Sequence, residues 1–365
     1  GAISNYAYAG ANNASAKAVI GDITGDFIGN YAKQTGGAIY NGGNTSPRNT
    51  VISYSNFVEN YSIGNGKSNA EGGGGAIYND KNAAIKGLDN VAPGLTYSKF
   101  IGNYTLVNGG AIYNAGHASN GVGLIDMRNN LFSGNKATKY GGAIYNETSA
   151  ITLSSNTFSS NTSTNGAALY NEKSVESVKD TFTRNTSTIY GGAIYNDTNA
   201  SLKLASAIFT ANSSNISGGA IYNTGTAEII NSTFGNTKNK YNSANTAMTG
   251  AVLYNIGKAK VSGSTGFRHY DNFILTKDGS WTVIQQGMNV GEKKARRYHW
   301  CSTNLRSFVE QPHTGIVGEN LGKILNLTDT AADRTRNSIL EMSREEPERV
   351  LKEILQIEKP AGEIL

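Results

Sequence analysis

Acidic side chains recur at one position of this chain, directly after an asparagine that closes a repeated motif. Glu147, Glu172 and Asp197 occupy this position in three consecutive repeats. If successive repeats stack, neighbouring carboxylates come within about 5 Å of each other. Like charges that close raise one another's pKa or attract a cation such as Ca²⁺. The three residues are therefore candidate metal ligands, and the alternative is a row of solvated surface acids beside lysines such as Lys173.

Carboxylates from adjacent repeats could also hydrolyse or cleave a polysaccharide. An inverting pair of carboxylates must be ~6.5–9.5 Å apart and must line a cleft that positions the sugar. Nothing in the sequence indicates such a cleft, so we assign no catalytic residue. Ca²⁺ is the one cofactor that the acids bring into consideration.

A column of tyrosines accompanies the acids, one in each repeat. Tyr145, Tyr170 and Tyr195 stand two residues before Glu147, Glu172 and Asp197, respectively. Alternation along a strand predicts that these rings point outward, where an exposed aromatic stripe can bind sugar rings or a partner protein. The three tyrosines are candidate ligand-binding residues. The alternative is a stacking ladder that only stabilises the repeats.

Three of the four histidines lie near the C-terminal end, at His269, His299 and His313, close in sequence to Cys301. These residue types can bind metal ions, but their spacing matches no ligand signature. With one cysteine the chain forms no internal disulfide.

The elements that position the acids and tyrosines are repeats of Gly-Gly-Ala-Ile-Tyr-Asn. The motif is complete or slightly varied in eight copies, which begin at residues 36, 74, 109, 141, 166, 191, 218 and 250. A second motif, Phe-x-x-Asn, is phased to the first, for example at Phe132–Asn135 and Phe182–Asn185. Fixed phasing at a period of this length is typical of a solenoid.

One compact repeat contains three short strand candidates, at Ala143–Tyr145, Ala150–Leu153 and Thr157–Ser159. Each strand must pair in parallel with its own copy in the next repeat, and parallel crossovers are right-handed. We therefore predict an all-β fold for residues 1–263, a right-handed single-stranded parallel β-helix of the pectin-lyase-like type.

The strand alternation also assigns faces. We expect Ile144 and Phe158 to point into the bore and Tyr145 to be exposed. The closing asparagines should lie at a corner, bonded to one another between coils, because Asn forms such ladders and tolerates positive φ. The paired glycines should supply a positive φ or a close backbone approach.

Composition excludes several classes of function. The net charge of +5 is spread over many repeats, so no basic patch for nucleic acid is predicted. No apolar run reaches the ~20 residues of a membrane helix. The first residues do not show the pattern of a signal peptide, and we expect this sequence to be a segment of a longer chain. We also expect the protein to be a monomer.

The paired motifs resemble the repeats of the chlamydial polymorphic outer-membrane proteins and of other bacterial autotransporter passengers, over residues 1–262. The resemblance implies a secreted β-helix on the bacterial outer-membrane surface that acts as an adhesin, with a host surface protein or glycan as partner. From this sequence we expect the chain to depart from these families in having no C-terminal membrane barrel and no visible signal peptide.

The sequence changes character after Gly263. A hairpin signal at Lys277–Ser280 and helical patterns at Asp329–Met342 and Pro347–Ile357 predict a small α+β tail over residues 264–365. Residues 267–313 resemble an uncharacterised family of archaea and thermophilic bacteria. We interpret the tail as a fragment of that unrelated family, and a C-terminal cap over the open end of the solenoid is the alternative.

These observations together predict a non-enzymatic passenger segment, an adhesin or a spacer. A carbohydrate-active β-helix enzyme, a polysaccharide lyase or hydrolase, is the alternative.

Overall fold

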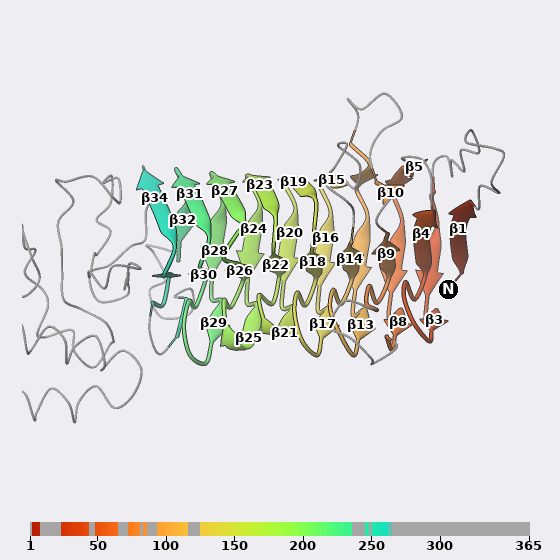
Figure 1. Cartoon of the computed structure of the whole chain (residues 1–365), viewed down its shortest axis with the longest axis horizontal. Helices are drawn as coiled ribbons and strands as arrows, with labels where there is room; N and C mark the ends of the chain where they lie inside the picture. Colours follow the sequence, from red (N-terminus) through yellow and green to blue (C-terminus); the bar gives the residue numbers. More distant parts are fainter. Residues whose placement is uncertain are drawn as a thin grey trace, which may run out of the picture.

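The described part of the protein is a rod of stacked coils, seen in a computed structural model of the chain (Figure 1). The structure describes residues 2–7, 23–43, 48–64, 72–80, 83–85, 93–115, 125–235, 245–247, 250–262 and 264. Within these ranges every element is a β-strand and every pairing is parallel, each strand bonding to its counterpart in the next coil. The predicted parallel β-helix is therefore confirmed. The predicted hairpin and helices of the tail lie outside the described residues.

Sheet A runs along the rod and is built from the Ile-Tyr-Asn part of each repeat. Its nine strands are β1 (Ile3–Ala7), β4 (Ile39–Gly43), β9 (Ile77–Asn79), β14 (Ile112–Asn114), β18 (Ile144–Asn146), β22 (Leu169–Asn171), β26 (Ile194–Asn196), β30 (Ile221–Asn223) and β33 (Leu253–Asn255).

Sheet B follows sheet A in each coil. Its eight strands are β6 (Ile52–Ser53), β11 (Leu95–Thr96), β15 (Ile125–Arg128), β19 (Ala150–Ser154), β23 (Ser174–Val178), β27 (Ser201–Ala205), β31 (Thr226–Ile230) and β34 (Lys258–Ser262). A separate pair is formed by β5 (Arg48–Asn49) and β10 (Ala83–Ala84).

Sheet C carries the phenylalanines of the Phe-x-x-Asn motif. Its eight strands are β2 (Asp26–Ile28), β7 (Asn56–Val58), β12 (Lys99–Ile101), β16 (Leu131–Ser133), β20 (Thr157–Ser159), β24 (Thr181–Thr183), β28 (Ile208–Thr210) and β32 (Thr233–Phe234).

Sheet D was not predicted from the sequence. Its seven strands are β3 (Tyr31–Ala32), β8 (Tyr61–Ser62), β13 (Tyr104–Thr105), β17 (Lys136–Ala137), β21 (Thr162–Asn165), β25 (Thr186–Tyr190) and β29 (Ser213–Ser214). Several have two residues, too short for a period-2 pattern to be recognised. A coil in which all four sheets are described therefore has four such strands rather than three.

The bore is filled by columns of like residues, as the alternation predicted. Ile144 and Phe158 are fully buried, and Phe158 stacks on Phe132 and Phe182 at ring-centroid distances of 4.8 and 5.0 Å. Identical residues repeat in register because the strands pair without shift in sheets A and C, as in the pairing of Phe132 with Phe158.

Asparagine ladders connect the coils at two corners. In the first ladder each closing asparagine donates its side-chain N–H to the side-chain oxygen of the next, at 2.9 Å from Asn146 to Asn171 and 2.8 Å from Asn171 to Asn196. In the second ladder, formed by the asparagines of Phe-x-x-Asn, both the backbone and the side-chain N–H of Asn135 donate to Asn161. The predicted ladder of closing asparagines is confirmed.

The reason given for those asparagines was partly wrong, because they do not adopt positive φ. Positive φ falls instead on the first glycine of each pair, such as Gly141 at 63°, and on residues that precede the Phe-x-x-Asn asparagines or sheet C, such as Ser160 and Ser155. The second glycine permits the predicted close approach, since a Cβ on Gly110 would lie 2.0 Å from the carbonyl oxygen of Gly142.

Candidate functional site: the tyrosine–carboxylate row

The tyrosine column lies on the outer side of sheet A, and its rings stack on one another. The centroid distance is 5.5 Å between Tyr145 and Tyr170, and 4.6 Å between Tyr170 and Tyr195. The column continues to both ends of the sheet. Its members are Tyr40, Tyr78, Tyr113, Tyr145, Tyr170, Tyr195, Tyr222 and Tyr254.

The prediction that Tyr145 is exposed was wrong, since only 5% of the residue is accessible. Rings above and below cover its faces, and Tyr140 of the preceding glycine corner packs 6.4 Å from it and 4.7 Å from Tyr170. Tyr170 is likewise buried, while Tyr195 is half-buried. The strand alternation correctly placed the Tyr145 ring on the outer side of sheet A. It could not show that Tyr140 covers that ring.

The three candidate acids follow strands β18, β22 and β26 and stack in register. The backbone N–H of Glu147, Glu172 and Asp197 each donates to the carbonyl oxygen of the closing asparagine one coil below, at 3.0, 2.9 and 2.9 Å. The sequence prediction that these acids share a position in successive coils is borne out by this pairing.

Each acid accepts a hydrogen bond from the tyrosine of the coil before it. The hydroxyl of Tyr113 donates to Glu147 at 3.0 Å, that of Tyr145 to Glu172 at 2.5 Å, and that of Tyr170 to Asp197 at 3.1 Å. Tyr40 makes the same bond to Asp80 at 2.6 Å. The two candidate sites that were predicted separately from the sequence therefore form one tyrosine–carboxylate row.

Burial and the row's charges shift the titration of its members. The pKa of Glu172 is raised, first by desolvation and then by Asp197 and Glu147, while the hydrogen bond from Tyr145 opposes the rise. Desolvation and the Asp197 carboxylate raise the pKa of Tyr195 to about 12. The pKa of Tyr145 is raised further still, by burial and by the Glu172 carboxylate. The hydroxyls of the row therefore stay protonated and act as hydrogen-bond donors.

The contacts of the row favour a structural role for the carboxylates as hydroxyl acceptors. Among the residues that the structure describes, no three His, Cys, Asp or Glu side chains are grouped so that they could hold a metal ion. Binding of Ca²⁺ by Glu147, Glu172 and Asp197 stays a prediction. The histidines of the tail, and Cys301, lie outside the described residues.

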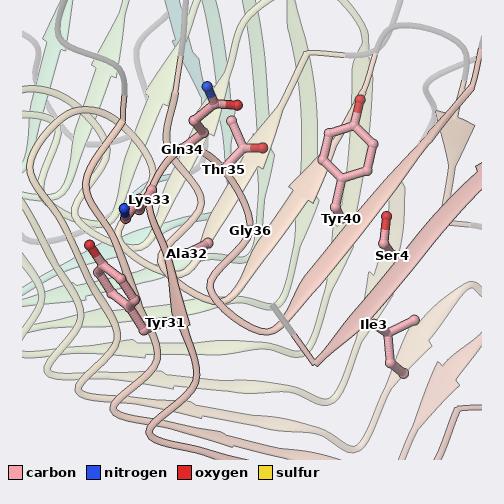
Figure 2. Close-up of a pocket in the computed structure, with 9 residues that line it drawn as sticks. All are labelled: Ile3, Ser4, Tyr31, Ala32, Lys33, Gln34, Thr35, Gly36 and Tyr40. Atoms are coloured by element: carbon pink, nitrogen blue, oxygen red, sulfur yellow. The ribbon is translucent and has the colours of Figure 1, made fainter.

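A hollow of about 710 Å³ lies at the N-terminal end of the rod, where Tyr40 of the tyrosine column lines it (Figure 2). Ser4 and Tyr40 face it from sheet A, and Tyr31 and Lys33 face it from the segment that follows sheet C. Among the described residues, those that line the hollow include no carboxylate.

One further acid was missed by the sequence analysis. Asp180 is buried and stands in a ladder of Ser and Asn side chains at the corner before sheet C, where Asn156 donates its backbone N–H to it at 2.6 Å and its side-chain N–H at 3.0 Å. Desolvation raises its pKa to about 6. The alignment of Asp180 with Asn130 and Asn156 in successive repeats could have revealed it.

The fold and this row define a parallel β-helix repeat protein whose coils are joined by side-chain ladders. Residues 131–147 and 181–197 each match the repeat of the Chlamydia polymorphic membrane proteins. Each match runs from sheet C through the glycine corner and sheet A to an acid of the row, Glu147 or Asp197. The resemblance inferred from the motifs is confirmed.

Residues 250–362 match a family described as a protein of unknown function (DUF763). The match agrees with the resemblance inferred for the tail, and it begins within the last described coil, ahead of β33. Comparison with curated proteins and with solved structures found no match. In the described part of the chain no helix is long and apolar enough to cross a membrane.

Proposed function

We infer that residues 1–263 are a segment of a surface-displayed passenger, and that this segment acts as a non-enzymatic adhesin or spacer at the bacterial outer-membrane surface. The observation that carries the proposal is the match of two coils to the polymorphic membrane protein repeat, which points to an outer-membrane or surface location. The rod also suits surface display, because two kinds of contact hold its coils together. Side-chain ladders run from coil to coil, and the tyrosines of one coil hydrogen-bond the acids of the next.

Surface display is tested on intact cells of the source organism. An antibody raised against the purified rod should label unpermeabilised cells, and external protease should remove the signal. A cytoplasmic marker antibody is the control. Labelling that requires permeabilisation would contradict surface display.

An adhesin and a spacer differ in whether the rod itself binds. Beads coated with the full chain should attach to host cells, or to an array of host glycans, above the level of beads coated with an unrelated β-helix. If the rod is a spacer, the coated beads should not attach. Deleting the rod from the passenger should then abolish binding by the segment that the rod carries.

The alternative, a polysaccharide lyase or hydrolase, draws support from the register of Glu147, Glu172 and Asp197, which places carboxylates of adjacent coils at one position. Desolvation also raises the pKa of Glu172, the direction that a general acid requires. Incubation with pectin and polygalacturonate, with and without Ca²⁺, tests it. Product release that is lost in Glu172→Gln but kept in the surface variant Glu176→Gln would favour the enzyme and contradict the adhesin.

A further inference from the structure

An exposed pair of stacked tyrosines lies at the corner between sheets B and C. Tyr54 and Tyr97 are 69% and 52% exposed, and their rings are 5° from parallel with centroids 5.2 Å apart. Both residues have a positive φ, of 48° and 49°, which a bulky side chain rarely adopts. A strained backbone that carries an exposed ring indicates a role outside folding.

Later coils close the same corner without an aromatic ring. The positive φ falls there on Asn129, Ser155, Lys179, Ser206 and Asn231. Asparagine tolerates this conformation better than tyrosine does, because its short polar side chain can hydrogen-bond locally. The turn itself therefore does not require the two rings.

One plane of the Tyr54 ring faces open space. Tyr97 of the next coil covers the other plane. The preceding coil is shorter at this corner, with only Thr24 and Gly25 where the coil of Tyr54 has residues 53–55. No residue of that shorter corner is in register with the ring, and a Cβ added to Gly25 would meet no atom within 4 Å. The stack thus ends in an aromatic platform above Gly25.

A carboxylate and an amide stand beside this platform. Asp26 and Asn56 occupy the first outward position of sheet C in the two coils, directly after the corner, and Asn56 follows Tyr54 by two residues. Asn56 donates a side-chain N–H to Asp26 at 2.6 Å. That bond leaves the second carboxylate oxygen of Asp26 and the amide oxygen of Asn56 to accept hydrogen bonds from a ligand.

This combination of groups fits a sugar. A pyranose ring has an apolar C–H side, which packs on an aromatic plane, and hydroxyls at its rim, which bond carboxylates and amides. An apolar ligand on Tyr54 would also remove water from the neighbouring Asp26 carboxylate, and that costs free energy unless hydrogen bonds replace the water. The hydroxyls of a sugar supply those bonds, so one ligand covers the ring and satisfies the carboxylate.

The charge beside the platform favours a neutral sugar. Asp26 stands in the coil that the open plane of Tyr54 faces. Lys99 occupies the same outward position of sheet C, but in the coil on the other side of Tyr54. An acidic sugar would therefore meet the like charge of Asp26 first, and like charges repel.

We propose that Tyr54, Asp26 and Asn56 form a binding site for a neutral hexose unit of a glycan. The C–H side of the hexose lies on the open plane of Tyr54, in the space above Gly25. Two neighbouring hydroxyls of the hexose bond Asp26 and Asn56. Tyr97 packs against the rear plane of Tyr54 and holds the ring in place.

The site gives the proposed adhesin a class of ligand, and its setting at the cell surface rests on that proposed function. Sugar binding is measured on the purified chain, so the two can fail separately. A chain that binds hexoses but is not displayed refutes surface display and keeps the site. A rod that attaches to host cells but binds no hexose keeps the adhesin and refutes the site.

The experiment is saturation-transfer NMR on the full chain with the methyl glycosides of galactose, glucose and mannose. One sugar ring on an exposed site implies a dissociation constant in the millimolar range, which this method detects. At least one glycoside should receive saturation, strongest at the protons of one C–H side. Tyr54→Asn should weaken its binding at least about tenfold, whereas Tyr54→Phe keeps the ring plane and should bind like wild type.

Controls separate loss of the site from loss of the fold. Tyr54→Asn copies Asn129, so the melting temperature should not fall. Lys179→Asn makes the same side chain at the same corner further along the rod and should leave binding unchanged. Asp26→Asn, at an exposed strand position, should weaken binding several-fold, because an amide is a weaker acceptor than a carboxylate. It decides the case in which Tyr54→Asn lowers stability.

Three outcomes overturn the proposal. The first is that none of the three glycosides binds at concentrations well above the millimolar range. The second is a glycoside that binds Tyr54→Asn and Asp26→Asn as tightly as wild type. The third is a protein or basic peptide that binds through Tyr54 while no glycoside does, which assigns the platform to that ligand.

Discussion

Removal of a single ladder asparagine, Asn161→Ala, should weaken the rod far more than an ordinary surface substitution. The side chain of Asn161 accepts two bonds from Asn135, at 2.9 and 3.0 Å, and donates to Phe132 at 3.0 Å and to Asn185 at 2.9 Å. All four hydrogen bonds are lost in the variant. The buried N–H groups of Asn135 and the buried carbonyl oxygen of Phe132 then lose Asn161 as their partner.

The magnitude follows from the number of bonds. A buried hydrogen bond contributes about 1 kcal/mol net, and a stranded buried group costs ~1–3 kcal/mol, so the expected loss is about 4 kcal/mol. At 1.4 kcal/mol per factor of ten, opening of this coil becomes roughly a thousand times more frequent. The effect should be strongest in the coils that carry Asn135 and Asn161, because each coil of a solenoid contacts only its neighbours.

Native-state hydrogen exchange measures the opening of individual coils, without assuming that the whole rod unfolds in one step. Peptides that cover residues 131–137 and 157–163 should lose protection by about three orders of magnitude, while those over 221–230 change little. Ser159→Ala, on the outer side of the same coil, is the matched control and should change exchange by less than tenfold. If Asn161→Ala lowers the free energy of local opening by less than about 1 kcal/mol, the ladder hydrogen bonds do not stabilise the coil as argued.

Three further predictions concern the bore, the buried acid and the tail. Ile144→Asp places an unpaired charge in the bore and should destabilise by several kcal/mol in denaturant titration, whereas Ile144→Val should cost about 1 kcal/mol; equal effects would contradict the burial. Asp180 has a folded pKa of about 6, above the 3.8 of the unfolded chain, so its ionisation costs stability as the pH rises from 4 to 6, by up to about 3 kcal/mol. Asp180→Asn should therefore be more stable than wild type at pH 7 and lose that advantage near pH 4, and a constant difference across this range would rule out the titration. Limited proteolysis should cut between Val261 and Arg268 first and leave a stable rod, and a tail as resistant as the rod would favour the capping alternative.

The candidate site shows where sequence patterns reach their limit. Tyr145 and Glu172 were both recognised as repeated positions, but they were treated as two separate sites. Their hydrogen bond joins tyrosine and acid of neighbouring coils, and the acid lies 27 residues further along the chain. Which hydroxyl meets which carboxylate depends on the packing between coils.

What the sequence determined by itself is the repeat and everything that its period dictates. Identical residues at fixed spacing imply stacking, stacking implies parallel pairing, and alternation then places Ile144 and Phe158 in the bore. The tertiary structure alone decided which outward residues are exposed. Tyr145 is buried because Tyr140 from the preceding glycine corner covers it, whereas Tyr54 and Tyr97 are exposed because a positive φ at a corner turns them to solvent. Both outcomes depend on how corners of adjacent coils meet, and a strand's own pattern carries no information about that.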